Sequence, residues 1–145
     1  MNILVLEDDP ITFSVIEYIK KLGYNVYHSQ NLLDIAYYLE ESPGVEFFDK
    51  LMFDVAVTKE KFSVFNNEEI EYGEKYNFSG FEFVLKNYKH ICHKEIALIT
   101  AYKVTLFDKV KERKDRDVLE KLTIIDKGAD DFVMDLLSFL NGKRG

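Results

Sequence analysis

Short apolar runs alternate with amphipathic stretches along the whole chain. Five of these runs have the length and composition of buried strands, and they lie at residues 3–6, 24–27, 48–54, 96–100 and 122–127. The stretches between and after them repeat apolar residues at the spacing of a helix. Strand and helix in strict alternation predict an α/β fold, in which helices cover both faces of a five-stranded parallel sheet.

The first predicted helix follows the first strand directly. An acidic run at residues 7–9 leads into Pro10, and this order suits the start of a helix, where proline fits the first turn and acids face the positive end of the dipole. Gly23 is the expected stop. We predict that four residues make the buried face of this helix: Ile11, Val15, Ile19 and Leu22.

The remaining helices are predicted with the same periodicity. The second has Leu32, Ile35, Ala36 and Leu39 on its buried face, and the third runs from Gly80 to about His90. A charged helical stretch follows from about residue 105 to 121, with a possible break near Asp115. Asp130 or Asp131 starts the last helix. The central strand is expected to run on to Val57, and residues 58–77 fit neither period.

Length and composition limit the classes of protein to which the chain can belong. Its 145 residues suit one domain, and the formal net charge of −7 argues against nucleic acid as a direct partner. A single cysteine, Cys92, excludes an intramolecular disulfide and fits a reducing compartment. The N-terminus lacks the features of a signal peptide, and no run reaches the length of a membrane span. We therefore expect a soluble, cytoplasmic protein with no membrane association.

Polar and charged residues stand where four of the predicted strands end. They are Glu7, Asp8, Asp54, Thr100 and Lys127. The carboxyl ends of parallel strands lie along one edge of a sheet, so we expect these side chains to lie together. Carboxylates this close raise one another's pKa, and a hard divalent cation such as Mg²⁺ would relieve the repulsion. A lysine and a hydroxyl beside them suit the oxygens of a phosphoryl group, and an aspartate that attacks phosphorus forms an acyl phosphate.

The same positions carry a resemblance to a known family. The chain resembles the receiver domain of response regulators in two-component signalling, and is similar to the stand-alone chemotaxis (CheY-like) receiver. The resemblance covers the whole chain apart from residues 58–77, and it rests on the segments 3–10, 48–55, 79–82 and 98–101 together with Lys127. It implies a flavodoxin-like, doubly wound sheet with the strand order 2-1-3-4-5.

The resemblance also implies a role for each of these positions. Asp54 matches the phosphoacceptor, Thr100 and Lys127 match the residues that contact phosphoryl oxygens, and Glu7 and Asp8 match the acidic pair that holds Mg²⁺ together with Asp54. The backbone carbonyl of Ala56 matches a further metal ligand. The implied partners are a histidine kinase or phosphotransfer protein, which donates the phosphoryl group, and a downstream protein that reads the signal.

The chain departs from the family's pattern in three places. Gly128 follows Lys127 where the family usually has a cis proline, and Ile124 stands where the family often has an aromatic switch. Residues 58–77 replace a short turn, and this insertion either covers the site, forms a partner surface or is a tolerated surface loop. An alternative alignment of the segment 128–132 would place Asp135 at the lysine position, but residues 122–125 already make the strand that Lys127 follows.

We therefore predict a single receiver domain over residues 1–145, with an insertion at about 58–77 and no output domain after its last helix. It would be a phosphoacceptor and not an enzyme in the ordinary sense. The first alternative is a pseudo-receiver that binds partners without being phosphorylated. The second is a phosphatase of the haloacid-dehalogenase type, which is disfavoured because Ala56 stands where the acid–base aspartate is needed.

Overall fold

A five-stranded parallel sheet forms the centre of the molecule, as predicted. The structure, a computed structural model, describes residues 1–142. The strands of the sheet are β1 (Asn2–Leu6), β2 (Asn25–Ser29), β3 (Lys50–Asp54), β6 (Glu95–Thr100) and β7 (Thr123–Asp126). Their spatial order is β2-β1-β3-β6-β7, which confirms the order 2-1-3-4-5 when only these strands are counted.

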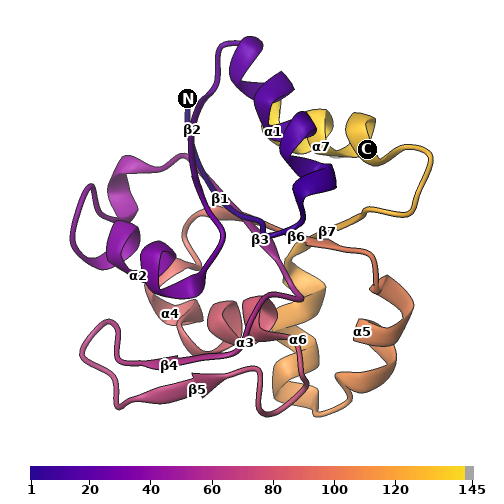
Figure 1. Cartoon of the computed structure of the whole chain (residues 1–145). Helices are drawn as coiled ribbons and strands as arrows, with labels where there is room; N and C mark the ends of the chain where they lie inside the picture. Colours follow the sequence, from indigo (N-terminus) through magenta and orange to yellow (C-terminus); the bar gives the residue numbers. More distant parts are fainter. Residues whose placement is uncertain (143–145) are drawn as a thin grey trace.

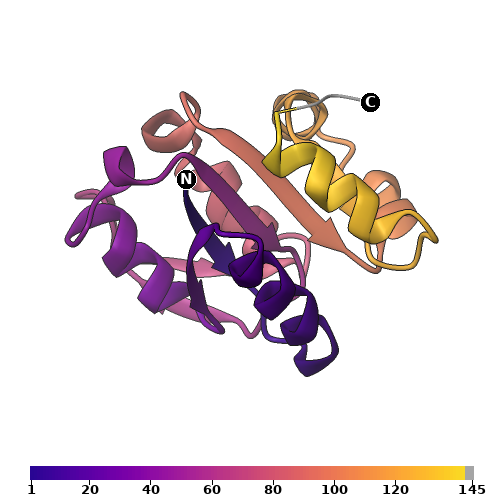
Figure 2. The same ribbon diagram turned by 90° about the horizontal axis from the view of Figure 1, so that it is seen from above.

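Helices cover both faces of this sheet (Figures 1 and 2). Helices α1 (Pro10–Lys21) and α7 (Phe132–Leu140) lie side by side on one face. The other face carries α2 (Leu32–Glu40), α3 (Ser79–Lys86), α4 (Tyr88–Ile91), α5 (Lys103–Lys109) and α6 (Arg113–Lys121). A 3-10 turn, η1 (Val45–Phe47), precedes β3. Two buried clusters follow from this layering, one on each face of the sheet.

Helix α1 starts where it was predicted but turns a different side to the sheet. The side chain of Asp9 caps it by accepting a hydrogen bond from the backbone N–H of Ile11 at 3.0 Å. Ile11 is 84% exposed and Leu22 is 48% exposed, so the predicted buried face was wrong at both ends. The stripe that faces the sheet contains Ile16 together with Ile19, which was predicted correctly, because a helix with 3.6 residues per turn presents only one stripe to the sheet.

Strand β3 ends at Asp54, and the prediction that it continues to Val57 was wrong. The chain leaves the ladder at that point because its next polar groups find other partners. The Ala56 N–H donates to Oδ1 of Asp54 at 3.1 Å, and the Val55 carbonyl accepts from the N–H of Gly80 at 3.0 Å. Helix α3 therefore begins directly against the end of the central strand.

Two predicted helices are each divided in two. The predicted helix from Gly80 to His90 is broken at Asn87, whose buried side-chain amide donates to the Phe83 carbonyl at 2.9 Å in competition with the backbone. The predicted break near Asp115 instead lies at residues 110–112. There the Arg116 guanidinium caps the end of α5, with hydrogen bonds of 2.7 and 3.2 Å to the carbonyls of Phe107 and Val110.

Part of the segment 58–77, predicted to be irregular, forms an antiparallel hairpin. Its strands are β4 (Glu60–Phe62) and β5 (Ile70–Tyr72). The side chains of Phe62, Val64 and Tyr72 are buried and join the core on the α2–α3 side of the sheet. Strands of three residues are too short to show a period of two in the sequence, so packing against the helices decides this structure.

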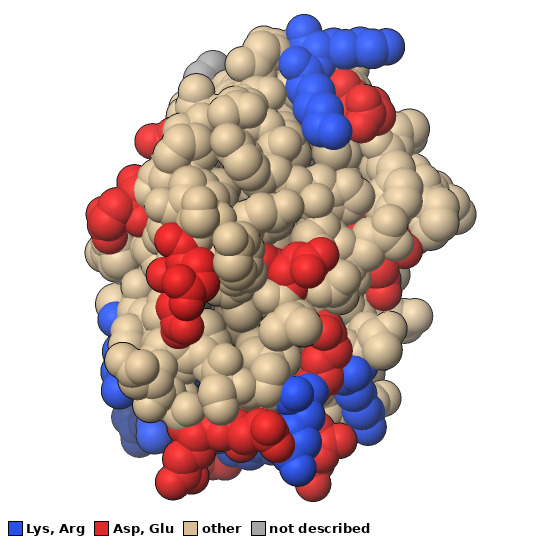
Figure 3. Space-filling view, turned by 60° about the vertical axis from the view of Figure 1, so that its left-hand side comes forward, with Lys and Arg blue, Asp and Glu red and all other residues tan. Residues whose placement is uncertain are grey.

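Polar contacts also attach the hairpin to its neighbours. Glu60 accepts a hydrogen bond of 2.6 Å from the Leu32 N–H at the start of α2. The Phe65 N–H donates to the Glu40 carboxylate at the other end of that helix. The face of the molecule that comes forward when Figure 1 is turned carries charges of both signs at its lower end and separate acidic groups across its middle (Figure 3).

Candidate functional site

The parallel ladder brings the predicted site residues to one edge of the sheet. Asp54 is the last residue of β3, and Glu7 follows β1 directly. The register pairs Leu6 with Phe53 across the β1–β3 ladder, so the two carboxylates extend beyond neighbouring strand ends. The side chain of Glu7 is fully buried, and Asp54 is 4% exposed. The carboxyl edge of the sheet thus holds a buried acidic pair, which is costly without a cation.

Lys127 supplies positive charge to this pair. Its Nζ lies 2.7 and 2.8 Å from the two carboxylate oxygens of Glu7 and 3.1 Å from Oδ2 of Asp54. The Lys127 N–H donates to the Thr100 carbonyl at 2.9 Å, which continues the β6–β7 ladder and aims the side chain at the carboxylates. The lysine therefore reaches the site although glycine, and not a cis proline, follows it. Asp135, the alternative at this position, lies instead in the first turn of α7.

The pKa of Asp54 is raised to about 7. Burial is the largest cause, and the neighbouring Glu7 carboxylate adds to it, while Lys127 and the Ala56 N–H lower the pKa only in part. Burial lowers the pKa of the Lys127 ammonium, but its contacts with Glu7 and Asp54 outweigh this effect and raise the pKa above its usual value. The site therefore holds more negative charge than its single lysine neutralises, and Asp54 carries that excess.

A third carboxylate completes the acidic cluster. Oxygen atoms of Glu7, Asp8 and Asp54 all lie within 4.8 Å of one another, and Asp8 is the more accessible member of the set. Burial and the Asp54 charge raise the pKa of Asp8. Three oxygen donors with an excess of negative charge are the donor set that Mg²⁺ prefers, so the residues present fit this ion.

The other two predicted residues lie at the same edge without joining the cluster. Thr100 ends β6 and is fully buried, and its hydroxyl accepts a hydrogen bond of 2.8 Å from the Tyr102 N–H. Within residues 1–142 it makes no hydrogen bond to Asp54. The Ala56 N–H binds Oδ1 of Asp54 as described above, and the role of its carbonyl as a metal ligand stays a prediction.

Two further residues support the site, and the sequence interpretation gave neither of them a role. Gly80 packs so closely on β3 that a Cβ there would lie 1.9 Å from the Asp54 carbonyl oxygen, so only glycine fits. A glycine near the start of a predicted helix was the available signal. The His28 ring donates a 2.8 Å hydrogen bond from Nε2–H to the Glu7 carbonyl. His28 directly follows the predicted strand at residues 24–27, and nothing in the sequence indicated this contact.

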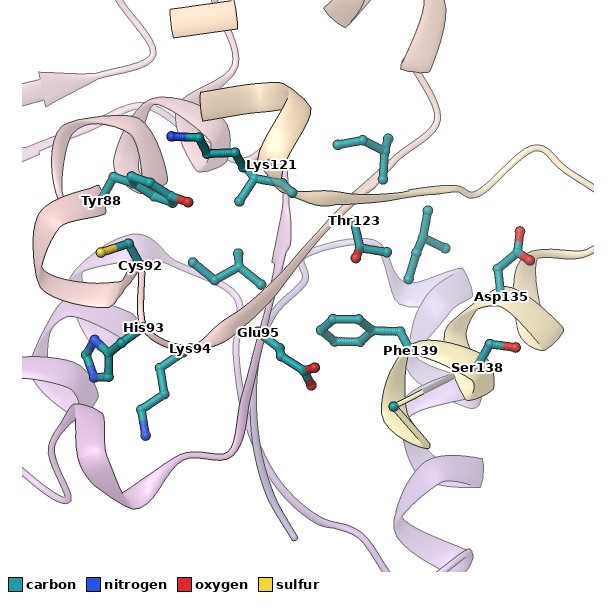
Figure 4. Close-up of a pocket in the computed structure, with 15 residues that line it drawn as sticks. Tyr88, Cys92, His93, Lys94, Glu95, Lys121, Thr123, Asp135, Ser138 and Phe139 are labelled. Carbon is teal, nitrogen blue, oxygen red and sulfur yellow. The ribbon is translucent and has the colours of Figure 1, made fainter. Parts of the chain in front are cut away.

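A cavity lies elsewhere in the molecule (Figure 4). It has a volume of about 620 Å³ and lies beside β7, between the ends of α4, α6 and α7. Tyr88, Cys92 and His93 line one side of it, and Ser138 and Phe139 line the other. None of the residues of the acidic cluster borders this cavity, so it is separate from the candidate site.

Comparison with solved structures identifies the architecture. The chain is similar to a CheY-like response regulator receiver domain protein from Methanospirillum hungatei JF-1, with 17% identity and a TM-score of 0.63. The match covers 97% of this chain and 90% of that one. The chemotaxis protein CheY4 of Vibrio cholerae gives 16% identity and a TM-score of 0.58, with 99% and 98% of the two chains covered. This chain has the receiver fold.

A third similar structure is longer than this chain. It is a response regulator protein from Burkholderia pseudomallei with a phosphorylated aspartic acid, a calcium ion and citrate, at 15% identity and a TM-score of 0.57. The match covers 96% of this chain and 65% of that one, so this chain spans about two thirds of that relative. A scan against family models finds no match, and a search of curated proteins finds none either. At these identities the likeness establishes the receiver fold alone.

Within the receiver fold, the geometry permits a specific chemistry. Asp54 offers a carboxylate nucleophile, and Lys127 holds a cation beside it at 3.1 Å. The cluster with Glu7 and Asp8 offers a divalent ion three oxygen donors. A nucleophile, a fixed cation and a metal-binding acidic set are the groups that transfer of a phosphoryl group needs.

Proposed function

We propose that this chain is a receiver of two-component signalling that accepts a phosphoryl group on Asp54. The observation that carries the proposal is the placement of Asp54 at the end of β3, in reach of Lys127 and within 4.8 Å of Glu7 and Asp8. The likeness to receiver structures supports it, and one of those structures is described with a phosphorylated aspartic acid.

The transfer is an in-line displacement at phosphorus. One Asp54 carboxylate oxygen attacks the phosphorus, the new O–P bond forms as the bond from phosphorus to the donor breaks, and the donor leaves with the electron pair of that bond. The product is an acyl phosphate on Asp54. Lys127 would move from Asp54 to an oxygen of the incoming group and balance part of its charge. Thr100, with its hydroxyl at the same edge, would contact another phosphoryl oxygen.

Glu7, Asp8 and Asp54 would hold a Mg²⁺ ion. When bound, this ion supplies positive charge to the phosphoryl oxygens and offsets the repulsion among the three carboxylates. The raised pKa of Asp54 supports this assignment, because a carboxyl that is half protonated near pH 7 needs additional positive charge to act as a nucleophile.

The proposed donor is a histidine kinase or a phosphotransfer protein, and the proposed reader is a downstream protein that binds the phosphorylated form. The chain would act on itself and turn over no separate substrate, so it is not proposed as an enzyme. No helix within residues 1–142 has the length and apolar character that crossing a membrane requires. We propose a cytoplasmic location, with proteins and not nucleic acid as direct partners.

A mass measurement tests the proposed function. The protein is incubated with Mg²⁺ and acetyl phosphate, and the intact mass is compared for the wild type, Asp54→Asn and Asp126→Asn. The expected result is an adduct of one phosphoryl group on the wild type and on Asp126→Asn, which lies outside the acidic cluster, and none on Asp54→Asn. An adduct that persists in Asp54→Asn would refute Asp54 as the acceptor.

One observation favours a second candidate, a pseudo-receiver that binds partners unphosphorylated. Asp54 is 4% exposed, and Lys127 already occupies the space beside it. If neither acetyl phosphate nor beryllofluoride with Mg²⁺ changes the wild-type protein in mass or in NMR spectrum, this candidate replaces the receiver. Release of phosphate from an ordinary phosphomonoester would instead indicate a phosphatase.

A further inference from the structure

The loop of residues 73–78 connects the hairpin to α3 and contacts both sides of the candidate site. We call this loop the strap. It begins at Gly73, which has a φ of +106°, a value that glycine adopts readily. It ends at Phe78, directly before α3. Its contacts reach α3, which starts directly against the end of β3, and the first turn of α6, so the strap is placed to influence access to Asp54.

On one side the strap is fixed to α3 by a buried carboxylate. Glu82 is 2% exposed and accepts four backbone hydrogen bonds, all of them from the strap: Gly73 at 3.0 Å, Lys75 at 3.0 Å, Tyr76 at 3.0 Å and Phe78 at 3.3 Å. Bonds to an ionised acceptor are about twice as strong as neutral ones. Helix α3 and the strap therefore behave as one unit.

That unit lies directly against the backbone of Asp54. Gly80, two residues before Glu82, donates its N–H to the Val55 carbonyl at 3.0 Å. Its Cα is so close to β3 that an added Cβ would lie 1.9 Å from the Asp54 carbonyl oxygen. Because packed contacts of this kind do not compress, the start of α3 cannot move independently of the Asp54 backbone.

On the other side the strap is bound to α6. Lys75 lies 2.7 Å from Asp115 and 2.7 Å from Glu112, and the Tyr76 hydroxyl donates to Asp115 at 2.5 Å. Asp115 is itself buried. These contacts join the loop before α3 to the first turn of a helix that lies more than thirty positions later in the sequence.

The strap also touches the segment that follows Thr100. The ring of Phe78 lies 6.3 Å from that of Tyr102, and the Lys109 ammonium lies 5.3 Å from the Phe78 ring. The Tyr102 N–H in turn binds the Thr100 hydroxyl. The strap is therefore hydrogen-bonded to α3, which follows Asp54 in the chain, and it packs on Tyr102, which follows Thr100.

This arrangement has a consequence for access to Asp54. At 4% exposure the side chain cannot meet a donor in the conformation described, so the surrounding elements must separate before any group reaches it. If α3 or the segment after Thr100 moved away from Asp54, the strap would be strained, because it is attached to both of these elements. We propose that the strap is a gate on Asp54, and that the contacts of Lys75 and Tyr76 with Asp115 are its latch.

The inference extends the proposed function, but it concerns accessibility and can be tested without phosphorylation. In a Cys92→Ser background, Asp54→Cys places a thiol at the site, and the rate of its reaction with iodoacetamide measures access. Releasing the latch with Lys75→Met and Asp115→Asn together is expected to raise this rate about 5-fold or more, the size of an ordinary coupling between sites. An unchanged or slower reaction would overturn the gate.

Two controls separate gating from loss of structure. Lys61→Met removes an exposed ion pair of the same hairpin, with Glu69 at 3.6 Å, and should leave the labelling rate unchanged. Hydrogen exchange of the β3 and β6 amides should stay slow in the latch variant, while the four strap amides bound to Glu82 exchange faster. Fast exchange throughout β3 and β6 would mean global unfolding, and the gate would then fail as the explanation of faster labelling.

A second arm distinguishes this proposal from the proposed function. With intact Asp54, the latch variant should gain the acetyl phosphate adduct faster than the wild type. If labelling is accelerated but neither protein forms the adduct, the gate stands and the receiver function fails. If both form the adduct and labelling is unchanged, the function stands and the gate fails.

Discussion

Two clusters in this molecule have the same composition and the opposite electrostatic outcome. In each, one lysine lies between two carboxylates: Lys127 between Glu7 and Asp54, and Lys75 between Glu112 and Asp115. The side chains of Asp54 and Asp115 are equally buried, each being 6% exposed. Yet the pKa of Asp54 is raised to about 7, whereas that of Asp115 is lowered.

Burial is the largest cause of the raised pKa of Asp54, and the second carboxylate of that cluster adds to it. Glu7 is fully buried beside Asp54, whereas the side chain of Glu112 is 55% exposed, so water screens its charge. Burial alone would raise the pKa of Asp115, but Lys75 and the Tyr76 hydroxyl outweigh it. In the latch the charge of the Asp115 carboxylate is thus compensated by its partners, whereas in the strand-end cluster the charge of Asp54 is not. Groups held in an unfavourable charge state are typical of functional sites.

The largest expected effect comes from removing each lysine in turn. In metal-free buffer at pH 8, Lys127→Met should lower the free energy of unfolding by about 3 kcal/mol, because it leaves two buried carboxylates without a cation. Lys75→Met should cost about 1 kcal/mol, because water reaches that cluster. Urea unfolding measures both. Equal losses would show that the two clusters do not differ in the way described.

Replacing each aspartate should give effects of opposite sign. The folded pKa of Asp54 lies above its unfolded value of 3.8, so the ionised group destabilises the fold increasingly as pH rises from about 4 to 7. Asp54→Asn should therefore stabilise the metal-free protein by about 1–3 kcal/mol at pH 8, and the gain should vanish near pH 4.

Asp115 has a lowered folded pKa, so the stability that it contributes is present above its unfolded pKa of 3.8 and is lost as the pH falls through the folded value. Asp115→Asn should therefore destabilise the protein by about 1 kcal/mol at pH 7 and by less in acid. Thermal unfolding across this pH range checks both variants. A stabilising Asp115→Asn or a destabilising Asp54→Asn at pH 8 would contradict the comparison.

The addition of Mg²⁺ should produce a smaller change in stability, and only through the strand-end cluster. An ion that binds only to the folded state stabilises it by about 1.4 kcal/mol when the ion concentration is about ten times the dissociation constant. This gain should appear in the wild type, persist in Glu112→Gln and disappear in Asp8→Asn, since Asp8 belongs to the strand-end donor set. A gain retained by Asp8→Asn would place the bound ion elsewhere.

The sequence was informative where a pattern is repeated or a strand ends. Five apolar runs predicted the sheet, and polar residues at their ends predicted which side chains would share one edge. The predicted helix faces were less reliable. On α1 the exposed Ile11 continues the apolar pattern that includes Ile19, and only the position of the sheet decides that Ile16 is buried and Ile11 is not.

The segment between β3 and α3 could not be predicted for a different reason. Its strands have three residues each, and its order depends on contacts with Leu32, Glu40 and Glu82, which lie outside the segment. The sequence predicted that close carboxylates raise one another's pKa, but it could not show that the burial of Asp54 itself is the largest cause of the shift. Spacing predicts that groups meet, whereas burial decides the charge that they carry.

The four hydrogen bonds to Glu82 have a consequence for the order of folding. The strap binds a carboxylate that belongs to α3, so four of its backbone N–H groups lack this partner until that helix is in place. The sheet and α3 should therefore form in the transition state, and the strap should close afterwards, with φ-values near zero for substitutions within it. Such late contacts affect chiefly the rate of unfolding, so the strap sets how long a folded molecule lasts more than how quickly it forms.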